Sequence, residues 1–255
     1  MQVVKYQKTY VVRSYEADCH GVLRLLSLMN ILQDIATENA DALGLGFVEC
    51  QKLNLAWVGS NYLLHIERMP KINETFTVTS WPAEAKLWGA VRDFVVTDAN
   101  GEIIIKASSQ WVLIDYVRRR PVMLKKYFPD YVALNERALA TDFAKMPEII
   151  GEGELHSYKV RFDDIDVNQH VNNAVYPLWA SESVHHDYRM THIPQELEIT
   201  FKKEALYGET VEVLTQHEGD ESRHSIRDKT TQEELALCRI KWRRVTSGSA
   251  AEERV

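Results

Sequence analysis

The chain has few cysteines and no long apolar run. Its three cysteines, Cys19, Cys50 and Cys238, are odd in number and too widely spaced for a disulfide framework. No CxxC spacing occurs, which argues against a zinc or redox motif of that type. No stretch of about 18 apolar residues exists, so we expect no membrane span. The first residues, MQVVKYQKTYVV, lack the basic start and apolar run of a signal peptide, so we expect a cytoplasmic location.

The chain also lacks an excess of positive charge. Its 30 Lys and Arg residues are outnumbered by 37 Asp and Glu residues, which gives a net charge of −7. General nucleic-acid binding usually requires a basic surface. We therefore expect no nucleic-acid partner, although local basic clusters are compatible with this balance.

The first half of the chain reads as strands with one helix near its start. Residues 2–14 alternate and are rich in Val and Tyr, which predicts a strand. Apolar residues from Leu25 to Leu43 recur at three- and four-residue steps, which predicts a long helix ended by Gly44. Four more strands are expected at about 54–68, 74–84, 88–98 and 102–116.

The second half repeats this order after a break. Residues 117–150 contain prolines and a short helix-like piece, Tyr131 to Leu139, and predict a linker. We therefore divide the chain into a first unit (1–116), the linker (117–150), a second unit (151–246) and a flexible tail (247–255). In the second unit we expect a strand at 154–162, a helix at about 174–188, and strands at about 195–204, 209–218, 222–230 and 234–246.

Two units with the same order of elements indicate an internal duplication. At an offset of 150 residues, His20 falls on His170. Repeat symmetry would make Asp18 and His20 a second site, but the first half lacks the Asn-Asn pair and a matching strand glutamate, so we favour a degenerate copy with a structural role. One helix with about five antiparallel strands cannot cover both of its own faces, whereas two such units can join their sheets. The predicted fold is α+β: a tandem, or double, hot-dog in which one continuous antiparallel sheet wraps two long central helices.

The densest polar stretch lies at the strand-to-helix junction of the second unit. Residues 164–173 read DIDVNQHVNN. Buried polar groups need hydrogen-bond partners, so this density is more economical as a site than as core. On spacing alone, a helix cap with an Asx turn is an equally good interpretation.

Several segments of the chain resemble one enzyme family. Residues 166–173, followed by Tyr176, Trp179 and Glu182, resemble the signature of the acyl-carrier-protein thioesterases, which include plant plastid enzymes and bacterial relatives. Segments 28–34, 107–112 and 118–121 resemble the first half of the same family. The resemblance implies the double hot-dog fold and hydrolysis of fatty acyl thioesters on acyl carrier protein, which ends fatty acid synthesis.

The resemblance also implies a catalytic set: Asp166, Asn168, His170 and Glu204, the last of which lies on the first strand after the second helix. Plant members often carry a cysteine directly after this glutamate. This chain has Ala205 at that position, so we expect no cysteine nucleophile there.

A thioester can be cleaved without a metal or a cofactor, and we expect neither. Imidazole titrates near neutral pH, and a desolvated carboxylate can act as a base. We expect His170 and Glu204 to position and deprotonate a water, with Asn168 orienting the water or the carbonyl and Asp166 holding the network. Attack by a carboxylate, which would form an acyl-enzyme, stays open.

Two groups of residues are candidates for binding the substrate. Backbone N–H groups at Asn172 and Asn173, at the start of the second helix, could polarise the thioester carbonyl. Arg118, Arg119 and Arg120 form a basic cluster on an acidic chain. Such a run is usually a solvated turn, but it would also attract an acidic carrier protein.

The first unit is rich in large apolar residues, most of which must form the core. The family resemblance implies that some of them line an acyl tunnel: Trp57, Tyr62, Trp81, Trp88 and Trp111 are the prominent ones. The two fused units either form a pseudo-dimer that needs no partner or pair further as a homodimer, and the sequence leaves both open.

Other functions compete with this reading: an acyl-CoA thioesterase, a hot-dog hydratase or dehydratase, and a non-catalytic acyl-binding protein. A metal cluster at His185-His186-Asp187, with His192 nearby, is a further alternative. Adjacent helical residues point about 100° apart, so we favour a polar helix end there.

Overall fold

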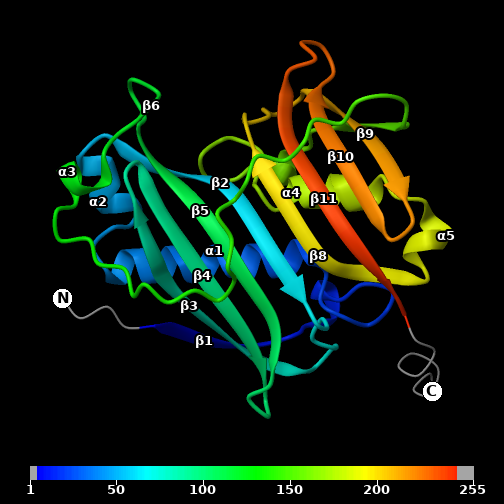
Figure 1. Ribbon diagram of the computed structural model, residues 1–255, viewed down its shortest axis with the longest axis horizontal. Coiled ribbons are helices and arrows are strands. Elements are labelled where there is room, and N and C mark those ends of the chain that lie inside the picture. The colour runs from blue at the N-terminus through cyan, green and yellow to red at the C-terminus, as the bar shows by residue number, and fades with distance from the viewer. Residues whose placement is uncertain (1–4, 246–255) are drawn as a thin grey trace.

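The computed structural model describes residues 5–245 and has the α+β class that the sequence predicts (Figure 1). The first unit contains β1 (Tyr6–Val11), a 3-10 turn η1 (Ser14–Glu16), α1 (Leu25–Ala42), α2 (Phe47–Lys52), β2 (Leu55–Ile66), β3 (Thr75–Lys86), β4 (Gly89–Asp98) and β5 (Ile103–Asp115). The linker contains β6 (Arg120–Pro121) and α3 (Leu124–Tyr127). The second unit contains β7 (Glu154–Lys159), η2 (Phe162–Asp164), α4 (Val175–Glu182), α5 (His186–Arg189), β8 (His192–Phe201), β9 (Thr210–Glu218), β10 (Glu221–Asp228) and β11 (Glu234–Arg244).

One sheet runs through both units. Its strand order is β1-β3-β4-β5-β2 in the first unit, continued by β8-β11-β10-β9-β7 in the second. The second order is the first in reverse, with each strand replaced by its counterpart. The units join where β2 pairs antiparallel with β8, from Asn61 opposite Thr200 to His65 opposite Glu196. This mirrored order is what the predicted duplication requires.

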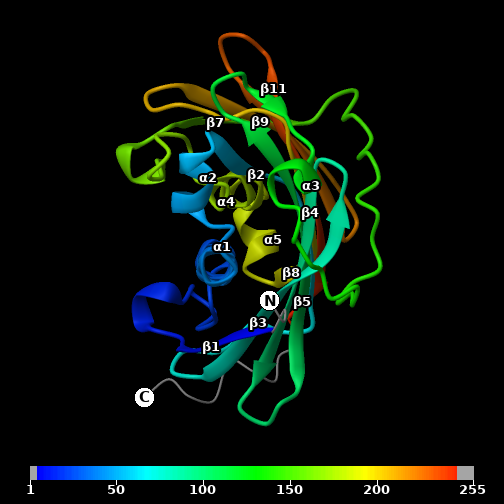
Figure 2. The ribbon, with the colours of Figure 1, turned by 90° about the vertical axis from the view of Figure 1, so that its left-hand side faces the viewer.

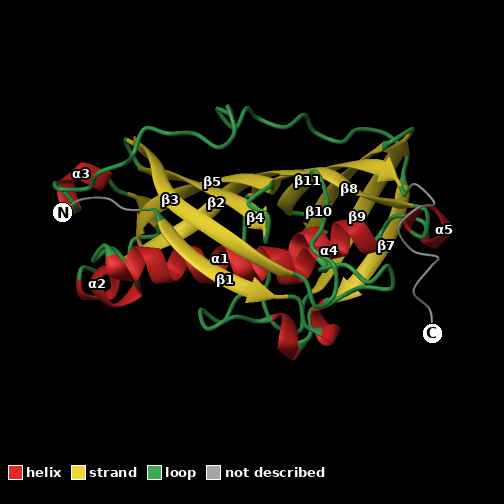
Figure 3. Cartoon of the chain, turned by 90° about the horizontal axis from the view of Figure 1, so that it is seen from below, coloured by secondary structure: helices red, strands yellow, loops and turns green. Residues whose placement is uncertain are grey.

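The two central helices lie on the same face of the sheet (Figures 1 and 3). The apolar stripe of α1 and the aromatic residues of α4 share one buried core with the inward rows of both half-sheets. Each of the following core residues is 4% exposed or less: Leu28, Leu32 and Ile35 of α1, and Tyr176 and Trp179 of α4. Burial of such side chains contributes about 1.5–3 kcal/mol each. The core therefore holds the two units together as well as each unit by itself.

The second central helix is shorter than predicted. A single helix at 174–188 is wrong, because α4 ends at Glu182 and the separate α5 begins at His186. The Ser183 hydroxyl donates to the Trp179 carbonyl at 2.8 Å, a local bond that competes with helix continuation. His185 then leaves the helical conformation, with φ −51° and ψ 134°, and its imidazole accepts from the Asp187 N–H, which caps α5.

The linker follows the outer face of the sheet, opposite the helices (Figures 2 and 3). The expected helix at Tyr131 to Leu139 is wrong, since this segment is irregular and the short helix is α3. Tertiary contacts override its helical pattern: the Trp81 indole donates to the Glu136 carbonyl at 2.8 Å, and the Leu134 N–H donates to the Pro82 carbonyl at 2.9 Å.

The short elements α2 and β6 were not expected. No helix within residues 5–245 is long and apolar enough to cross a membrane. The predicted flexible tail, residues 247–255, lies outside the described residues. The boundaries of the two units and of the linker remain predictions.

Candidate active site

The polar stretch between η2 and α4 is a loop pinned at both ends. The buried Asp164 carboxylate accepts from the Arg161 backbone N–H and from its guanidinium, both at 2.8 Å. The Asp164 carbonyl accepts from the Asn172 N–H at 2.8 Å, so the loop leaves and returns at one point. A loop fixed in this way can hold the side chains at its tip in a defined geometry.

The tip of the loop is a tight turn from Asp166 to His170. The Asp166 N–H donates to the His170 carbonyl at 2.9 Å, and Gln169 adopts a positive φ of 66°. The Asp166 carboxylate accepts from the backbone N–H of Asn168 at 2.8 Å and from its amide at 3.3 Å. Asp166 therefore holds Asn168 in place through an Asx turn of the kind that spacing alone suggested.

The expectation that Glu204 lies on the strand is wrong, because β8 ends at Phe201, and it is the segment after β8 that brings this carboxylate to the histidine. The Val171 N–H donates to the Ala205 carbonyl at 3.0 Å, which ties the loop to this segment. The Ala205 N–H in turn donates to the Tyr176 hydroxyl of α4 at 2.9 Å. As a result, His170 Nε2 lies 3.5 Å from Glu204 Oε1, and both side chains are about one-third exposed, at 34% and 33%. Water can therefore reach both groups. The distance of 3.5 Å is long for a hydrogen bond, and catalytic hydrogen bonds often shorten when a substrate binds.

An arginine from the first half reaches this pair. Arg119, in the turn after β5, has a positive φ of 49° and pairs through Nη2 with Glu204 Oε1, the oxygen that faces His170. Arg118 instead lies 3.8 Å from Asp115, and the exposed Arg120 is in β6. The predicted arginine cluster is therefore divided, and only Arg119 lies at the candidate site.

The two asparagines before α4 have different surroundings. The Asn172 backbone N–H is occupied by Asp164, while its side chain accepts from the Ala174 N–H at 2.9 Å and donates to Asn30 of α1 at 3.3 Å. Across residues 5–245, the Asn173 N–H donates no backbone or side-chain hydrogen bond. Of the two expected oxyanion donors, only the Asn173 N–H is free in this conformation, because the Asn172 N–H already donates to the Asp164 carbonyl.

Two family models match the chain: the acyl-ACP thioesterase N-terminal domain over residues 3–132, and the acyl-ACP thioesterase C-terminal domain over residues 148–244. The chain belongs to the acyl-ACP thioesterase family. A chloroplastic acyl-[acyl-carrier-protein] hydrolase of Cuphea viscosissima is 31% identical and is aligned over 96% of this chain. The chain spans 64% of that relative's length and 54% of a second hydrolase from the same plant.

Solved structures of the family have the same fold. The 12:0-ACP thioesterase from Umbellularia californica is 25% identical, with a TM-score of 0.84 over 94% of this chain and 98% of that one. An acyl-ACP thioesterase from Bacteroides thetaiotaomicron has a TM-score of 0.83 over the same shares at 21% identity, a likeness of fold alone. The predicted double hot-dog is thereby confirmed.

The corresponding loop of the first unit, residues 17–23, differs from the loop at the candidate site. The bridges Ala17–Leu23 and Ile165–Val171 are related by 148 residues (165 minus 17, and 171 minus 23). The equivalence of His20 with His170 at an offset of 150 is therefore wrong, and Val22 stands where His170 stands. The offset becomes 150 only at the starts of α1 and α4, because the second unit has two extra residues there.

The first unit also lacks the carboxylate. The Leu23 N–H donates to the Pro70 carbonyl at 2.8 Å, as the Val171 N–H donates to the Ala205 carbonyl. By this correspondence Met69 stands where Glu204 stands. The first unit therefore has valine and methionine in place of the His170–Glu204 pair, which agrees with the prediction of a degenerate copy.

The cysteines are poorly placed for nucleophilic attack. Ala205, directly after Glu204, is fully buried. Burial raises the pKa of the Cys50 thiol to about 11 and also raises the pKa of the Cys238 thiol, which disfavours both thiolates. Cys19 is exposed, and its sulfur contacts Met190 at 4.0 Å. No group of three or more His, Cys, Asp or Glu side chains suited to a metal occurs within the part of the chain that the structure describes.

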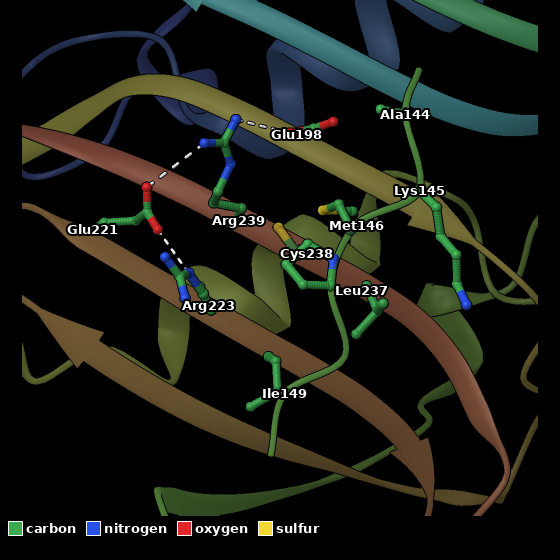
Figure 4. Close-up of a pocket in the computed structure, with 11 residues that line it drawn as sticks. Ala144, Lys145, Met146, Ile149, Glu198, Glu221, Arg223, Leu237, Cys238 and Arg239 are labelled. Atoms are coloured by element: carbon green, nitrogen blue, oxygen red, sulfur yellow. Dashed lines mark hydrogen bonds and ion pairs between the residues drawn. The ribbon is translucent and has the colours of Figure 1, made fainter. Parts of the chain in front are cut away.

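Besides an open hollow of about 710 Å³ between β1 and α1, two smaller cavities lie on opposite faces of the sheet. One, of about 280 Å³, lies between the linker and the outer face of the second unit (Figure 4). Its walls carry paired charges, with Arg239 reaching Glu198 and Glu221, and Arg223 reaching Glu221. The other, of about 80 Å³, lies between α1 and the inner face of the first unit and is mostly apolar. Of these two smaller cavities, the second has the more apolar walls and suits a hydrocarbon chain better.

Proposed function

We propose that this protein hydrolyses the thioester of a fatty acyl chain on acyl carrier protein, releasing the free fatty acid and the carrier thiol. The observation that carries the proposal is the His170–Glu204 pair at 3.5 Å, presented by the pinned loop of a member of the acyl-ACP thioesterase family. The names of the relatives support the same substrate class.

In the proposed reaction, His170 and Glu204 take a proton from a water whose oxygen attacks the thioester carbonyl carbon. The oxyanion of the tetrahedral intermediate accepts from the Asn173 N–H, and Asn168, held by Asp166, orients the water. The carbon–sulfur bond then breaks, and the proton moves to the departing sulfur. No metal or cofactor enters this scheme.

We assign the acyl chain to the first unit, residues 1–116, and the catalytic residues to the second unit, residues 151–246. The apolar cavity beside α1 supports this division, because its walls include Trp57 and Trp111. Trp81 does not belong to this tunnel, since its ring packs under the linker on the outer face. Of the remaining aromatic candidates, Tyr62 is buried against Trp111, with ring centroids 6.2 Å apart.

We propose that the carrier protein docks at the arginine turn, Arg118–Arg120, beside the candidate site. Arg118→Glu should raise the KM for the carrier substrate severalfold at low salt, and added salt should reduce the difference. Lys106→Glu, an equal charge change at an exposed site on β5, is the matched control. An unchanged KM for Arg118→Glu would remove this turn from carrier docking.

A thiol-release assay tests the main proposal. Saturated acyl chains of graded length are offered on acyl carrier protein and on coenzyme A, and both the thiol and the acyl product are measured. Thiol release that is faster from the carrier protein supports the proposal, whereas faster release from coenzyme A identifies an acyl-CoA thioesterase. A change in unsaturation without thiol release indicates a hydratase or dehydratase, and acyl binding without any turnover indicates a binding protein.

We further propose that the protein acts in the cytoplasm and that one chain carries a complete site. Two buried free thiols, Cys50 and Cys238, suit a reducing compartment. The β2–β8 junction supplies within one chain the contact that a homodimer of single units would need. Light scattering on the active protein tests the second point, since activity confined to a homodimer would contradict it.

A further inference from the structure

The arginine turn carries one guanidinium from the end of β5 to the segment after β8. β5 and β6 pair at Asp115 and Arg120, so residues 116–119 form the tip of a hairpin. The Asp115 carboxylate accepts from the backbone N–H groups of Val117 and Arg118, at 3.1 Å and 2.9 Å, which fixes the backbone of the tip. Arg119 follows at the left-handed position, and its long side chain reaches Glu204 on the far side of β2.

This guanidinium occupies the oxygen that the proposed reaction uses. Glu204 Oε1 pairs with Arg119 Nη2 and is also the oxygen that lies 3.5 Å from His170 Nε2. In the proposed reaction a proton passes to His170 or to Glu204, which adds a positive charge or removes a negative one beside the guanidinium. The Arg119–Glu204 pair opposes that transfer, because a guanidinium is stabilised by an ionised carboxylate and repelled by a second cation.

The pair can exchange for another partner at small cost. The Arg119 side chain is well exposed and that of Glu204 is one-third exposed, and exposed ion pairs contribute little to stability. A guanidinium has five N–H donors, yet within residues 5–245 Arg119 makes no side-chain hydrogen bond except the one to Glu204. An anionic group that approaches the turn from solvent therefore meets free donors on Arg119.

We propose that Arg119 determines specificity by making hydrolysis depend on the carrier protein. This inference rests on the proposed function. Without the carrier, Arg119 stays paired with Glu204 and slows proton transfer. When the carrier docks at the turn, an anionic oxygen of the carrier substrate binds the guanidinium and leaves Glu204 to His170. That oxygen belongs to a carboxylate of the carrier or to the phosphate of its pantetheine arm. A thioester without an anionic group meets the paired form, of which only a fraction is competent.

The test compares one acyl chain on three thiols: acyl carrier protein, coenzyme A, and N-acetylcysteamine, which has neither protein nor phosphate. Arg119→Met should raise kcat/KM for the N-acetylcysteamine thioester by up to about fivefold, the most that an exposed ion pair can hold back. With the carrier substrate, the same variant should keep its kcat and raise the KM, because the docked carrier loses a contact.

The coenzyme A substrate identifies the group that releases Arg119. Coenzyme A has the same arm phosphate as the carrier but no protein. A gain in Arg119→Met that equals the gain with N-acetylcysteamine would assign the release to carboxylates of the carrier. No gain with coenzyme A, alongside a gain with N-acetylcysteamine, would assign it to the phosphate.

Salt and two further variants separate this role from a structural one. Salt screens exposed ion pairs, so it should speed hydrolysis of the neutral N-acetylcysteamine thioester by wild type but not by Arg119→Met. Arg119→Lys keeps the charge and should keep the wild-type ratio of carrier to N-acetylcysteamine rates. Lys202→Met is the matched control, because it removes an exposed ion pair with Glu234 from the same segment and should leave both rates unchanged.

Two results with folded Arg119→Met would overturn the proposal. An equal loss with all three substrates would show that Arg119 holds Glu204 in place for the reaction. Unchanged rates with all three would show that Arg119 has no part in specificity. If Arg119→Met does not fold, the salt response of wild type decides the matter, since no acceleration of the neutral thioester would also overturn the proposal.

NMR of the Arg119 side-chain N–H groups tests the release without turnover. Acyl carrier protein with its free arm is added to wild type, and Arg119→Lys identifies the signals. Signals that move on carrier binding, with no thiol release from any substrate, would refute the proposed hydrolysis and keep the release of Arg119. Thiol release with rates that ignore Arg119, and signals that stay in place at saturating carrier, would do the reverse.

Discussion

Replacing Glu204 with glutamine tests the proposed chemistry most directly. The substitution keeps the size and shape of the side chain but removes its negative charge. It leaves His170 without the carboxylate 3.5 Å away, and it breaks the ion pair with Arg119. The change therefore acts on proton transfer and on one exposed salt bridge, two effects that differ in size.

The two effects can be separated by their magnitudes. Loss of a group that moves protons should lower kcat by about 10²-fold or more, which corresponds to about 2.7 kcal/mol in activation free energy. The Arg119–Glu204 pair is exposed, at 71% and 33%, so its loss should cost no more than about 1 kcal/mol of unfolding free energy. For a chain of this size that is a fall in Tm of about 2–4 °C.

The assay is thiol release from an acyl-carrier substrate, with Tm measured on the same preparation. Glu233→Gln is the matched control, because Glu233 also forms an exposed ion pair, with Lys203, on the segment beside β8. It should show a similar small change in Tm and an unchanged kcat. Near-normal turnover by folded Glu204→Gln would refute the role of Glu204 in proton transfer.

Three other predictions concern the buried His224, the contact between Gly59 and Asn173, and the cysteine thiols. Burial lowers the pKa of His224 to about 3, so below pH 6.5 the unfolded chain binds a proton more readily than the folded chain. The free energy of unfolding should therefore fall by about 1.4 kcal/mol per pH unit below pH 6.5. In His224→Asn, chemical denaturation at several pH values should show a weaker dependence of the unfolding free energy on pH. Gly59→Ala should shift the Asn173 side-chain amide by a few tenths of an ångström and lower kcat by no more than about tenfold at nearly constant Tm, and a larger loss would show that this amide, and not the backbone N–H alone, takes part in the reaction. A thiol reagent at pH 8 should label only the exposed Cys19 in the folded protein, because Cys50 and Cys238 are buried and roughly one thousandth of Cys50 is ionised at that pH. Labelling should leave hydrolysis intact, and loss of activity would support a cysteine mechanism instead.

Much of the fold follows from local patterns in the sequence. Alternation and tight turns place every long strand of the sheet to within a few residues, because one face of each strand is buried. The linker could not be predicted in this way. The helical pattern from Tyr131 to Leu139 is overridden by contacts with Trp81 and Pro82, which belong to a strand about fifty residues earlier. Such contacts leave no periodic signal.

The site could be predicted only in part, for the same reason. The turn from Asp166 to His170 is local, and its Asx bond follows from the residue types. Arg119 was expected to bind the carrier, but its pairing with Glu204 joins residues 85 apart through the neighbouring strands β5, β2 and β8. The offset of the repeat was wrong by two residues because sparse identities cannot locate an insertion. The hydrogen bonds of the loops locate it.

That insertion explains why a duplicated chain would have one site rather than two. The two extra residues stand where Asn172 and Asn173 extend toward the first unit, to Asn30 and to the backbone at Gly59. In the opposite direction, Arg119 extends from the first half to Glu204. In the first unit the loop is two residues shorter and carries Val22, and the segment after β2 carries Met69, so this unit offers neither the reach nor the His–Glu pair. The candidate site therefore belongs to the junction of the two units, and a separated second unit should not be active even if it folds.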